Sequence, residues 1–433
     1  MKRNILLLSI FVLGTMSAMA DYNPANNGSA SKMKTGNRNA STTTDAPFYN
    51  PAGAVWGADG FTLEFSTIPF YSTKSIFDNG NFSGNSLEYK SKTSSLLYPA
   101  LNLTYKKDRF ALFMFAGITN GGGAGNYNDG LPTFERLGYL NVMTGIMGGL
   151  LPGAVTDYGV KTSFKGSAYG VGGWLGAAYR VNDWLSVGGA FQYSRQMNHQ
   201  EGWLDITYTP APSAVPIPRT EIDVDFTGQS FGFIGSVDLK PMPNLLIANT
   251  FRYFTEMELE TKVNDNKSGG LFTDGEKVKS TYVPTYNLGI AYSANEKLTV
   301  HYNMNVSFYS MLNLDKDVDG VNVAEYYHNG IDFGVAAEYQ FTEKFNWGVG
   351  CTYAPYKMKR QYQSEMEFEN NTIWLNTGAS LKLKENLGID LGFQVGLATQ
   401  ERKVESTDWV ASFNQKYENG PSYSMGIGFW YKF

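Results

Sequence analysis

The sequence predicts an all-β protein: a 14-stranded antiparallel transmembrane β-barrel plugged by an N-terminal hatch segment. Three observations support this fold class: the composition, long runs of alternating apolar and polar residues, and a regular alternation of short and long connections. Of the 433 residues, 47 are glycine, 28 are tyrosine and 28 are phenylalanine, while only 17% are charged. Such a composition is typical of many strands joined by tight turns.

The apolar alternation is clearest in the last strand that we expect, residues 421–433. The residues predicted to face outward are Tyr423, Met425, Ile427, Phe429, Tyr431 and Phe433, and those between them are predicted to face inward. A soluble β-sandwich also alternates, but it buries its apolar face against a second sheet. A transmembrane strand shows that face to lipid and needs about 9–11 residues, and the runs here have that length.

The connections decide the topology. We expect tight turns near residues 107–108, 182–183, 241–242, 295–296, 342–343 and 385–386, and long loops at 72–95, 119–164, 198–220, 258–278, 310–328, 357–370 and 401–420. Short and long connections alternate without exception, as in a barrel with short periplasmic turns and long outer loops. The predicted strands are 61–71, 96–106, 109–118, 165–180, 184–197, 221–239, 243–257, 279–293, 297–309, 329–341, 344–356, 371–384, 387–400 and 421–433.

The N-terminus carries the features of an export signal. Lys2 and Arg3 precede an apolar stretch from Ile5 to Leu13, and Ala18-Met19-Ala20 is typical of a cleavage site. We therefore expect residues 1–20 to be a cleaved signal peptide, residues 21–60 to be the hatch and residues 61–433 to be the barrel. No other apolar stretch approaches the length of a membrane-spanning helix.

Several functional classes are disfavoured by the residues themselves. The net charge of −5 argues against nucleic-acid binding, and the single cysteine, Cys351, excludes an intrachain disulfide. Cys351 is expected on the outward face of its strand. No nucleophile-elbow, zinc-protease or P-loop motif occurs, and the three histidines are far apart in sequence. We expect no cofactor, no metal site and no enzymatic activity.

The longest loop, 119–164, differs from the others. It opens with Asn120-Gly121-Gly122-Gly123 and continues with apolar residues at spacings of three and four, among them Leu140, Ile146 and Met147. This pattern indicates one or two short amphipathic helices. They could simply pack over the barrel mouth, or they could offer an apolar landing surface for a ligand, and the two roles are compatible.

The segment before the first predicted strand resembles the hatch of a known family. It contains Gly36-Asn37-Arg38-Asn39-Ala40 and then Asn50-Pro51-Ala52, and the latter matches the Asn-Pro-Ala motif of the FadL/TodX family. Stretches 164–193 and 283–300 are also similar to that family, whose members transport long-chain fatty acids and hydrocarbons across bacterial outer membranes. The resemblance implies a hatch inside the barrel, an apolar pocket, a ligand groove among the outer loops and lateral escape through a gap in the wall.

The resemblance leads us to expect an outer-membrane transporter for passive uptake of hydrophobic small molecules, with long-chain fatty acids as the expected cargo. A general porin or a structural barrel without specific cargo is the alternative. The expected partners are a fatty acid or hydrocarbon, lipopolysaccharide and other outer-membrane lipid, and the barrel-assembly machinery. We expect a monomer that binds no nucleic acid.

Strand parity selects the candidate ligand-binding residues. Phe113, Phe115, Trp174 and Phe254 are predicted to face inward, with Phe70, Leu96, Leu246 and Trp374, where they could line a pocket or fill space between hatch and wall. Arg252 is predicted to be a lumenal cation. Because an unpaired buried guanidinium is costly, we expect it to have an anionic partner. That partner could be a wall carboxylate, such as Glu64 or Glu338, or a ligand carboxylate.

The candidate gating residues are Asn50, Pro51 and Ala52. Pro51 fixes its own backbone and biases Asn50 towards extended geometry, so this pair should form a stiff corner. The corner could act as a switch when ligand leaves, or it could merely turn the chain into the first strand.

Overall fold

The computed structural model describes residues 28–78, 88–132, 135, 157–209, 219–265, 267, 272–317, 320–365, 367–398, 402–405 and 414–433. Its helices are α2 (Ala30–Thr35), α3 (Ala46–Tyr49), η1 (Pro51–Val55), η2 (Tyr309–Met311), η3 (Val323–Tyr326) and η4 (Arg360–Tyr362). In the described part of the chain, no helix has the length and apolar character needed to cross a membrane.

The strands follow one another along almost the whole chain after residue 59. They are β1 (Gly60–Thr67), β2 (Phe70–Asp78), β3 (Glu88–Ser95), β4 (Pro99–Lys107), β5 (Phe110–Tyr127), β6 (Asp157–Arg180), β7 (Leu185–Thr209), β8 (Thr220–Met242), β9 (Leu245–Phe254), β10 (Met257–Asp265), β11 (Lys277–Ser280), β12 (Thr285–Ser293), β13 (Leu298–Ser307), β14 (Gly330–Thr342), β15 (Phe345–Ala354), β16 (Thr372–Lys384), β17 (Leu387–Ala398), β18 (Arg402–Glu405), β19 (Asn414–Asn419) and β20 (Ser422–Lys432).

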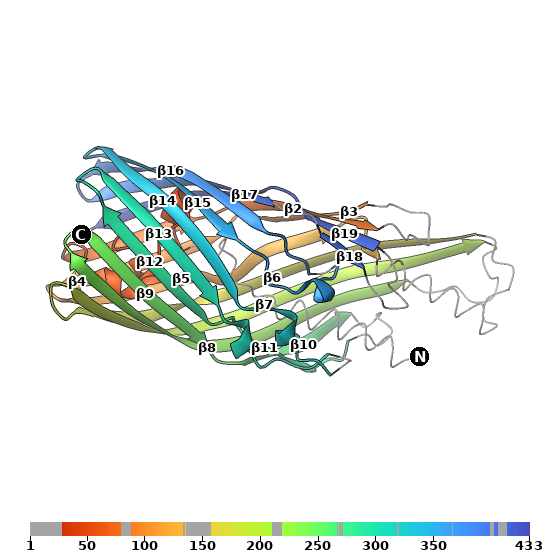
Figure 1. Cartoon of the computed structure of the whole chain (residues 1–433). Helices are drawn as coiled ribbons and strands as arrows, with labels where there is room; N and C mark the ends of the chain where they lie inside the picture. The colour runs from red at the N-terminus through yellow and green to blue at the C-terminus, as the bar shows by residue number, and fades with distance from the viewer. Residues whose placement is uncertain are drawn as a thin grey trace.

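Within the described residues, fourteen strands close into an antiparallel ring, which confirms the predicted barrel (Figure 1). The order around the ring is β1, β4, β5, β6, β7, β8, β9, β12, β13, β14, β15, β16, β17, β20 and back to β1. The remaining strands continue six of these beyond a short interruption, so a ring position such as the first is built from β1 and β2.

Exposure along the strands agrees with the predicted faces. In β20, Tyr423, Met425 and Phe429 are exposed, whereas Ser424 faces the interior and is 3% exposed. An exposed apolar face on a closed barrel is what lipid contact requires. Leu96 departs from the prediction: it was expected inside, but it lies in the interruption between β3 and β4 and is 90% exposed.

The strands on one side of the barrel are much longer than expected. β6, β7 and β8 contain 24, 25 and 23 residues and extend well past their neighbours (Figure 1). The predicted loops at 72–95, 119–164 and 198–220 are therefore partly strand. The prediction failed there because the outward residues become polar, as at Lys165, Glu201 and Asp225, so the apolar alternation disappears although the pairing continues.

The described part of the hatch, residues 28–59, contacts the inner wall. Its first helix, α2, begins after Ser29, whose side chain accepts a hydrogen bond from the Lys32 amide, and ends at Gly36, whose φ of 69° suits glycine. α2 packs against β15, β16, β17 and β20, while η1 packs against β6, β7 and β8. The hatch thus bridges opposite parts of the barrel wall.

Wall glycines allow the hatch to approach this closely. A Cβ atom on Gly289 would lie 2.4 Å from the Ala40 nitrogen, and one on Gly392 would lie 2.5 Å from the Lys34 nitrogen. Both contacts are impossibly short against backbone, so side chains at these positions would push the hatch away. Part of the high glycine content therefore has a structural reason inside the barrel.

Candidate functional site

The predicted ligand-binding residues that the structure describes lie in two neighbouring rows across the inner wall. One row runs from β5 to β9 through Phe115, Trp174, Gln192, Gly232 and Phe254, which are successive cross-strand partners. The adjacent row, two residues nearer the short turns, includes Phe113, Ala190, Ile234 and Arg252. Strand pairing thus brings together residues that are up to 141 positions apart in sequence.

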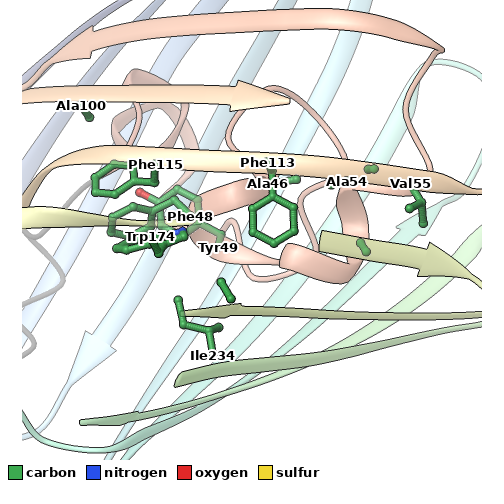
Figure 2. Close-up of a cluster of buried hydrophobic side chains, with 13 residues drawn as sticks. Ala46, Phe48, Tyr49, Ala54, Val55, Ala100, Phe113, Phe115, Trp174 and Ile234 are labelled. Carbon is green, nitrogen blue, oxygen red and sulfur yellow. The ribbon is translucent and has the colours of Figure 1, made fainter. Parts of the chain in front are cut away.

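The hatch occupies the space in front of these rows. The ring of Phe48 lies 4.7 Å from that of Phe115 and 5.0 Å from that of Trp174, between ring centroids, and Phe115 stacks on Trp174 at 4.2 Å (Figure 2). Trp174 also donates a hydrogen bond from Nε1 to the Pro47 oxygen at 2.7 Å. In this state Phe113, Phe115 and Trp174 pack against the hatch in one buried cluster.

Arg252 lies at the edge of the same cluster and is 4% exposed. Its guanidinium carbon is 4.9 Å from the centroid of Trp174 and 5.2 Å from that of Phe48, and Nη2 donates a hydrogen bond to the Phe48 carbonyl oxygen. The two carboxylates considered as partners bind elsewhere in the hatch: Glu64 accepts from Thr44 and Glu338 accepts from Lys34. Arg252 therefore contacts the hatch through a backbone oxygen.

Phe254 belongs to a second apolar cluster, further towards the long-loop end. Its ring makes an edge-to-face contact with that of Tyr282, with centroids 5.1 Å apart and an interplanar angle of 70°. The other members of this cluster are Ile222, Val224, Phe226, Met257, Leu259, Val263 and Phe272. Leu140, Ile146 and Met147, the candidates in the long loop, lie outside the described residues.

The Asn50-Pro51-Ala52 motif is fixed to the wall at several points. Asn50 Nδ2 donates to Asp238 Oδ2 and to the Ser41 oxygen, both at 3.1 Å, and Asn50 Oδ1 accepts from Ser236 Oγ at 3.0 Å. The Ala52 oxygen accepts from Ser186 Oγ at 3.0 Å. Pro51 begins η1, where its missing N–H carries no penalty. The motif lies between α3 and η1 and forms an attachment point to β7 and β8.

A buried ionic network holds the other end of the hatch. Arg38 donates to both oxygens of Asp45, at 2.8 and 2.7 Å, and its Nη1 reaches Glu338 Oε1 at 3.3 Å. Lys34 Nζ lies 2.8 Å from Glu338 Oε2. Burial opposes the charge on Arg38, but the Asp45 carboxylate outweighs this effect and raises the pKa of the guanidinium above its ordinary value. Lys34 and Arg38 both pair with Glu338 and thereby tie the hatch to β14.

Two cavities lie at the end of the barrel that carries the short turns. Their volumes are about 320 and 330 Å³, and both are lined by Arg38, Thr42, Thr43, Glu338, Gln340 and Asn346. The charged lining is unsuited to an apolar molecule, which would leave these groups without water or partners.

The barrel wall is interrupted beside the hatch. β3 pairs with β5 from Ser94 opposite Ala124 towards the long-loop end. β4 pairs with β5 from Ala100 opposite Gly117 towards the short-turn end. Between these two paired regions, residues 95–99 face residues 118–123, and β5 shifts register twice against β6 in the same stretch. The side chain of Tyr98 fills the interruption: it is 1% exposed and its hydroxyl donates to the Gly121 oxygen at 3.1 Å.

Three important residues were missed by the sequence reasoning. Asp238 could have been found, because strand parity places this carboxylate inward, two residues from Ser236. Gln192 could have been found in the same way, since it alternates with Phe191 and Tyr193. Phe48 gave no signal, because the hatch has no periodicity from which an orientation could be predicted.

A closed fourteen-stranded barrel with a lipid-facing apolar surface and an internal hatch defines an outer-membrane transport barrel. A family model for outer membrane protein transport proteins (OMPP1/FadL/TodX) matches residues 154–433. The chain therefore belongs to the OMPP1/FadL/TodX family of outer-membrane transporters of hydrophobic compounds, and it is not an enzyme.

Solved structures share this fold at low sequence identity. A Pseudomonas aeruginosa FadL homologue superposes with a TM-score of 0.65 at 13% identity, covering 95% of this chain and 98% of the homologue. The Ralstonia pickettii toluene transporter TbuX gives a TM-score of 0.60 at 17% identity, covering 95% and 100%. The P. putida toluene transporter TodX gives 0.53 at 13%, covering 91% and 95%. No curated protein sequence matches the chain.

Proposed function

We propose that this protein is a passive route for long-chain fatty acids into the outer membrane of a bacterial cell. The observation that carries the proposal is the position of Arg252. This buried guanidinium lies beside the apolar rows of Phe115 and Trp174, and it donates a hydrogen bond to a backbone oxygen of the hatch. A ligand carboxylate that replaced the Phe48 oxygen would form a stronger hydrogen bond, because donor and acceptor would then both be charged.

The proposed exchange also has an apolar component. Phe48 occupies the space between Phe115, Trp174 and Arg252, so a ligand chain that entered this space would replace the contacts of the Phe48 ring. Asn50, Pro51 and Ala52 then act as the gating corner, because they connect Phe48 to the attachment on Asp238. Phe113, Phe254 and the loop residues Leu140, Ile146 and Met147 complete the ligand-binding residues that we propose.

We further propose that the ligand leaves sideways at the interruption beside Tyr98. The alternative exit leads out through the short-turn end of the barrel. It passes the ionic network of Arg38 and Glu338 and the charged cavities at that end. An apolar chain on that path would have to separate buried ion pairs, which is costly. The sideways path ends beside Leu96 and Leu97, which are 90% and 66% exposed.

The expectations on processing and partners become proposals as well. We propose that residues 1–20 are removed as a signal peptide, that 21–60 form the hatch and that 61–433 form the barrel. We also propose that the barrel-assembly machinery inserts the chain, that it functions as a monomer and that lipopolysaccharide surrounds its outer half. The general porin is disfavoured, because the hatch fills the lumen with side chains that are bonded to opposite walls.

Binding of a fatty acid and of an uncharged hydrocarbon of equal length by purified protein tests the proposal. Arg252→Ala should weaken fatty-acid binding at least tenfold more than hydrocarbon binding, because a charge-assisted hydrogen bond contributes about 1.5–3 kcal/mol. Arg252→Lys should retain part of the preference. The control is Arg195→Ala, which removes an exposed arginine on the outer face of β7. Equal losses for both ligands would assign Arg252 to structure, and no binding of either ligand by the wild type would reject the function.

A further inference from the structure

A stripe of polar side chains runs along the lumenal face of β7. Its members alternate with outward residues and are buried: Gln192, Ser194, Gln196, Asn198 and Gln200. The stripe starts in the row of Trp174 and Phe254 and continues towards the long-loop end. These groups would not favour the passage of purely apolar molecules. Each buried amide or hydroxyl requires a hydrogen-bond partner, and an apolar molecule cannot supply one.

The neighbouring strand presents the opposite character to the same part of the lumen. Asn198 pairs with Phe226, and Gln200 pairs with Val224, and both of these β8 residues belong to the apolar cluster that includes Met257 and Leu259. Polar and apolar stripes therefore run side by side along this part of the wall. Such a surface matches an amphiphile, which has one hydrogen-bonding group and one apolar chain.

Tyr282 connects the two stripes. Its ring packs in the apolar cluster, while its hydroxyl donates to Gln196 Oε1 at 3.0 Å and lies 2.9 Å from Ser194 Oγ. Ser194 Oγ also hydrogen-bonds to the hydroxyl of Thr119. Thr119 lies in the distorted stretch of β5 that receives the Tyr98 hydroxyl at Gly121. Two tyrosines are thus bonded to the same irregular part of the wall, Tyr98 directly and Tyr282 through Ser194.

Gln192 supplies an independent sign of a ligand. Its side chain is 2% exposed, and among the described residues its Oε1 atom accepts no hydrogen bond. It lies directly between Trp174 and Gly232 in the row that the hatch covers. A buried amide oxygen without a donor is costly, and a hydroxyl or protonated carboxyl group of a ligand would satisfy it.

We propose that Gln192, Ser194, Gln196 and Tyr282 form a subsite for the polar head of an oxygen-bearing amphiphile and thereby discriminate against plain hydrocarbons. Passage of a ligand requires the Tyr282 hydroxyl to break its hydrogen bonds to Gln196 and Ser194. An amphiphile head replaces the lost hydrogen bonds, and a hydrocarbon does not. This inference rests on the proposed function, and it assigns selectivity to neutral hydrogen bonding, in addition to the charge of Arg252.

Uptake of three radiolabelled tracers tests the inference: palmitate, hexadecanol and hexadecane, supplied to a Gram-negative host that lacks its own transporter of this family. The wild type should take up hexadecanol faster than hexadecane. Tyr282→Phe should raise hexadecane uptake about fivefold, since opening no longer breaks the bonds of the tyrosine hydroxyl. Gln192→Met should lower hexadecanol uptake about fivefold and leave hexadecane uptake unchanged.

The matched control is Tyr286→Phe, which removes a hydroxyl that donates to Asn249 Oδ1 at 2.6 Å. It should leave the ratio of hexadecanol to hexadecane uptake at the wild-type value. Heat-modifiable migration of each variant on gels shows that the barrel has assembled. If the wild type takes up both neutral tracers equally, or if Tyr286→Phe matches Tyr282→Phe, the subsite is wrong while the transport function stands. If the wild type takes up none of the three tracers, both proposals fail.

Discussion

Asn50 in the hatch and Asp238 in β8 are joined by a buried hydrogen bond of 3.1 Å between Nδ2 and Oδ2. The same carboxylate oxygen accepts from Trp56 Nε1 at 3.0 Å, so a single wall residue anchors both ends of η1. The hatch segment around Phe48 lies just before this anchor, and its position against Arg252 depends on the corner that Asn50 and Pro51 form. The contact thus links the motif to the ligand-binding rows.

Replacing Asn50 and Pro51 with alanine should lower the uptake of apolar ligands while the barrel still assembles. The double variant loses the amide contacts to Asp238, Ser236 and Ser41, each of which contributes about 1 kcal/mol, but it changes no strand pairing. Fatty-acid uptake by cells and heat-modifiable migration on gels measure the two properties separately. Normal uptake with normal assembly would show that the motif only turns the chain.

Deleting residues 23–50 should open the barrel to ions. The deletion removes α2, the Arg38 network and Phe48, which together connect the hatch to β14 and to the aromatic rows. Steady conductance should appear in planar bilayers, whereas the full chain should remain closed. A deletion variant that assembles, stays silent in bilayers and takes up fatty acid normally would contradict both the plug and the gate.

Gly289→Ala should displace the hatch without disturbing the barrel. The new methyl group would lie 2.4 Å from the Ala40 nitrogen, whereas at Gly235, also in a wall strand, a Cβ atom meets nothing within 4 Å. Gly235→Ala is therefore the matched control. We expect transient conductance steps in planar bilayers for Gly289→Ala alone. Identical, silent traces for both variants would mean that close approach at β12 does not hold the hatch in place.

The docking of α2 should become more stable as the pH rises from 8 towards 10.5. Burial lowers the pKa of Lys32 to about 8, whereas a lysine in an undocked, solvated hatch titrates near 10.5. Between these values the undocked state binds more protons, so the free energy of docking becomes more favourable with rising pH, by at most about 3 kcal/mol. Hydrogen exchange of the α2 amides, corrected for intrinsic rates, should show increasing protection.

Lys32→Met is the control for this pH dependence, because it keeps the length of the side chain and removes the titrating group. The variant should show the same corrected protection at pH 8 and at pH 10. A wild-type protein whose protection is also constant over this range would place the Lys32 amine in a well-solvated environment and reject the assignment.

The barrel was predictable from the sequence because lipid imposes a simple rule on every membrane-spanning strand. The alternation in 421–433 places Met425 and Phe429 outward, as the structure confirms, and the same parity places Arg252 and Trp174 inside. The expected strand 61–71 missed the interruption between β1 and β2. The alternation ends at Thr67, and Pro69, which cannot donate to the ladder, marks the break.

The candidate site was predictable only in part for a related reason. Strand parity identified the wall residues Phe113, Phe115, Trp174 and Phe254, and it could not identify what faces them. The residue that faces Phe115 and Trp174 is Phe48, whose segment folds by contact with the wall and carries no repeat of its own. Asp238 shows the same limit, since its role depends on a hatch residue 188 positions away.

In the proposed function, a plugged barrel moves amphiphiles and excludes water-soluble solutes. Proteoliposomes that contain the purified full chain test both halves in one preparation, by uptake of radiolabelled palmitate and by swelling in a sugar solution. We expect palmitate uptake above that of protein-free liposomes, with no swelling. Rapid swelling in sugar without palmitate uptake would reject the proposed function and identify an open pore.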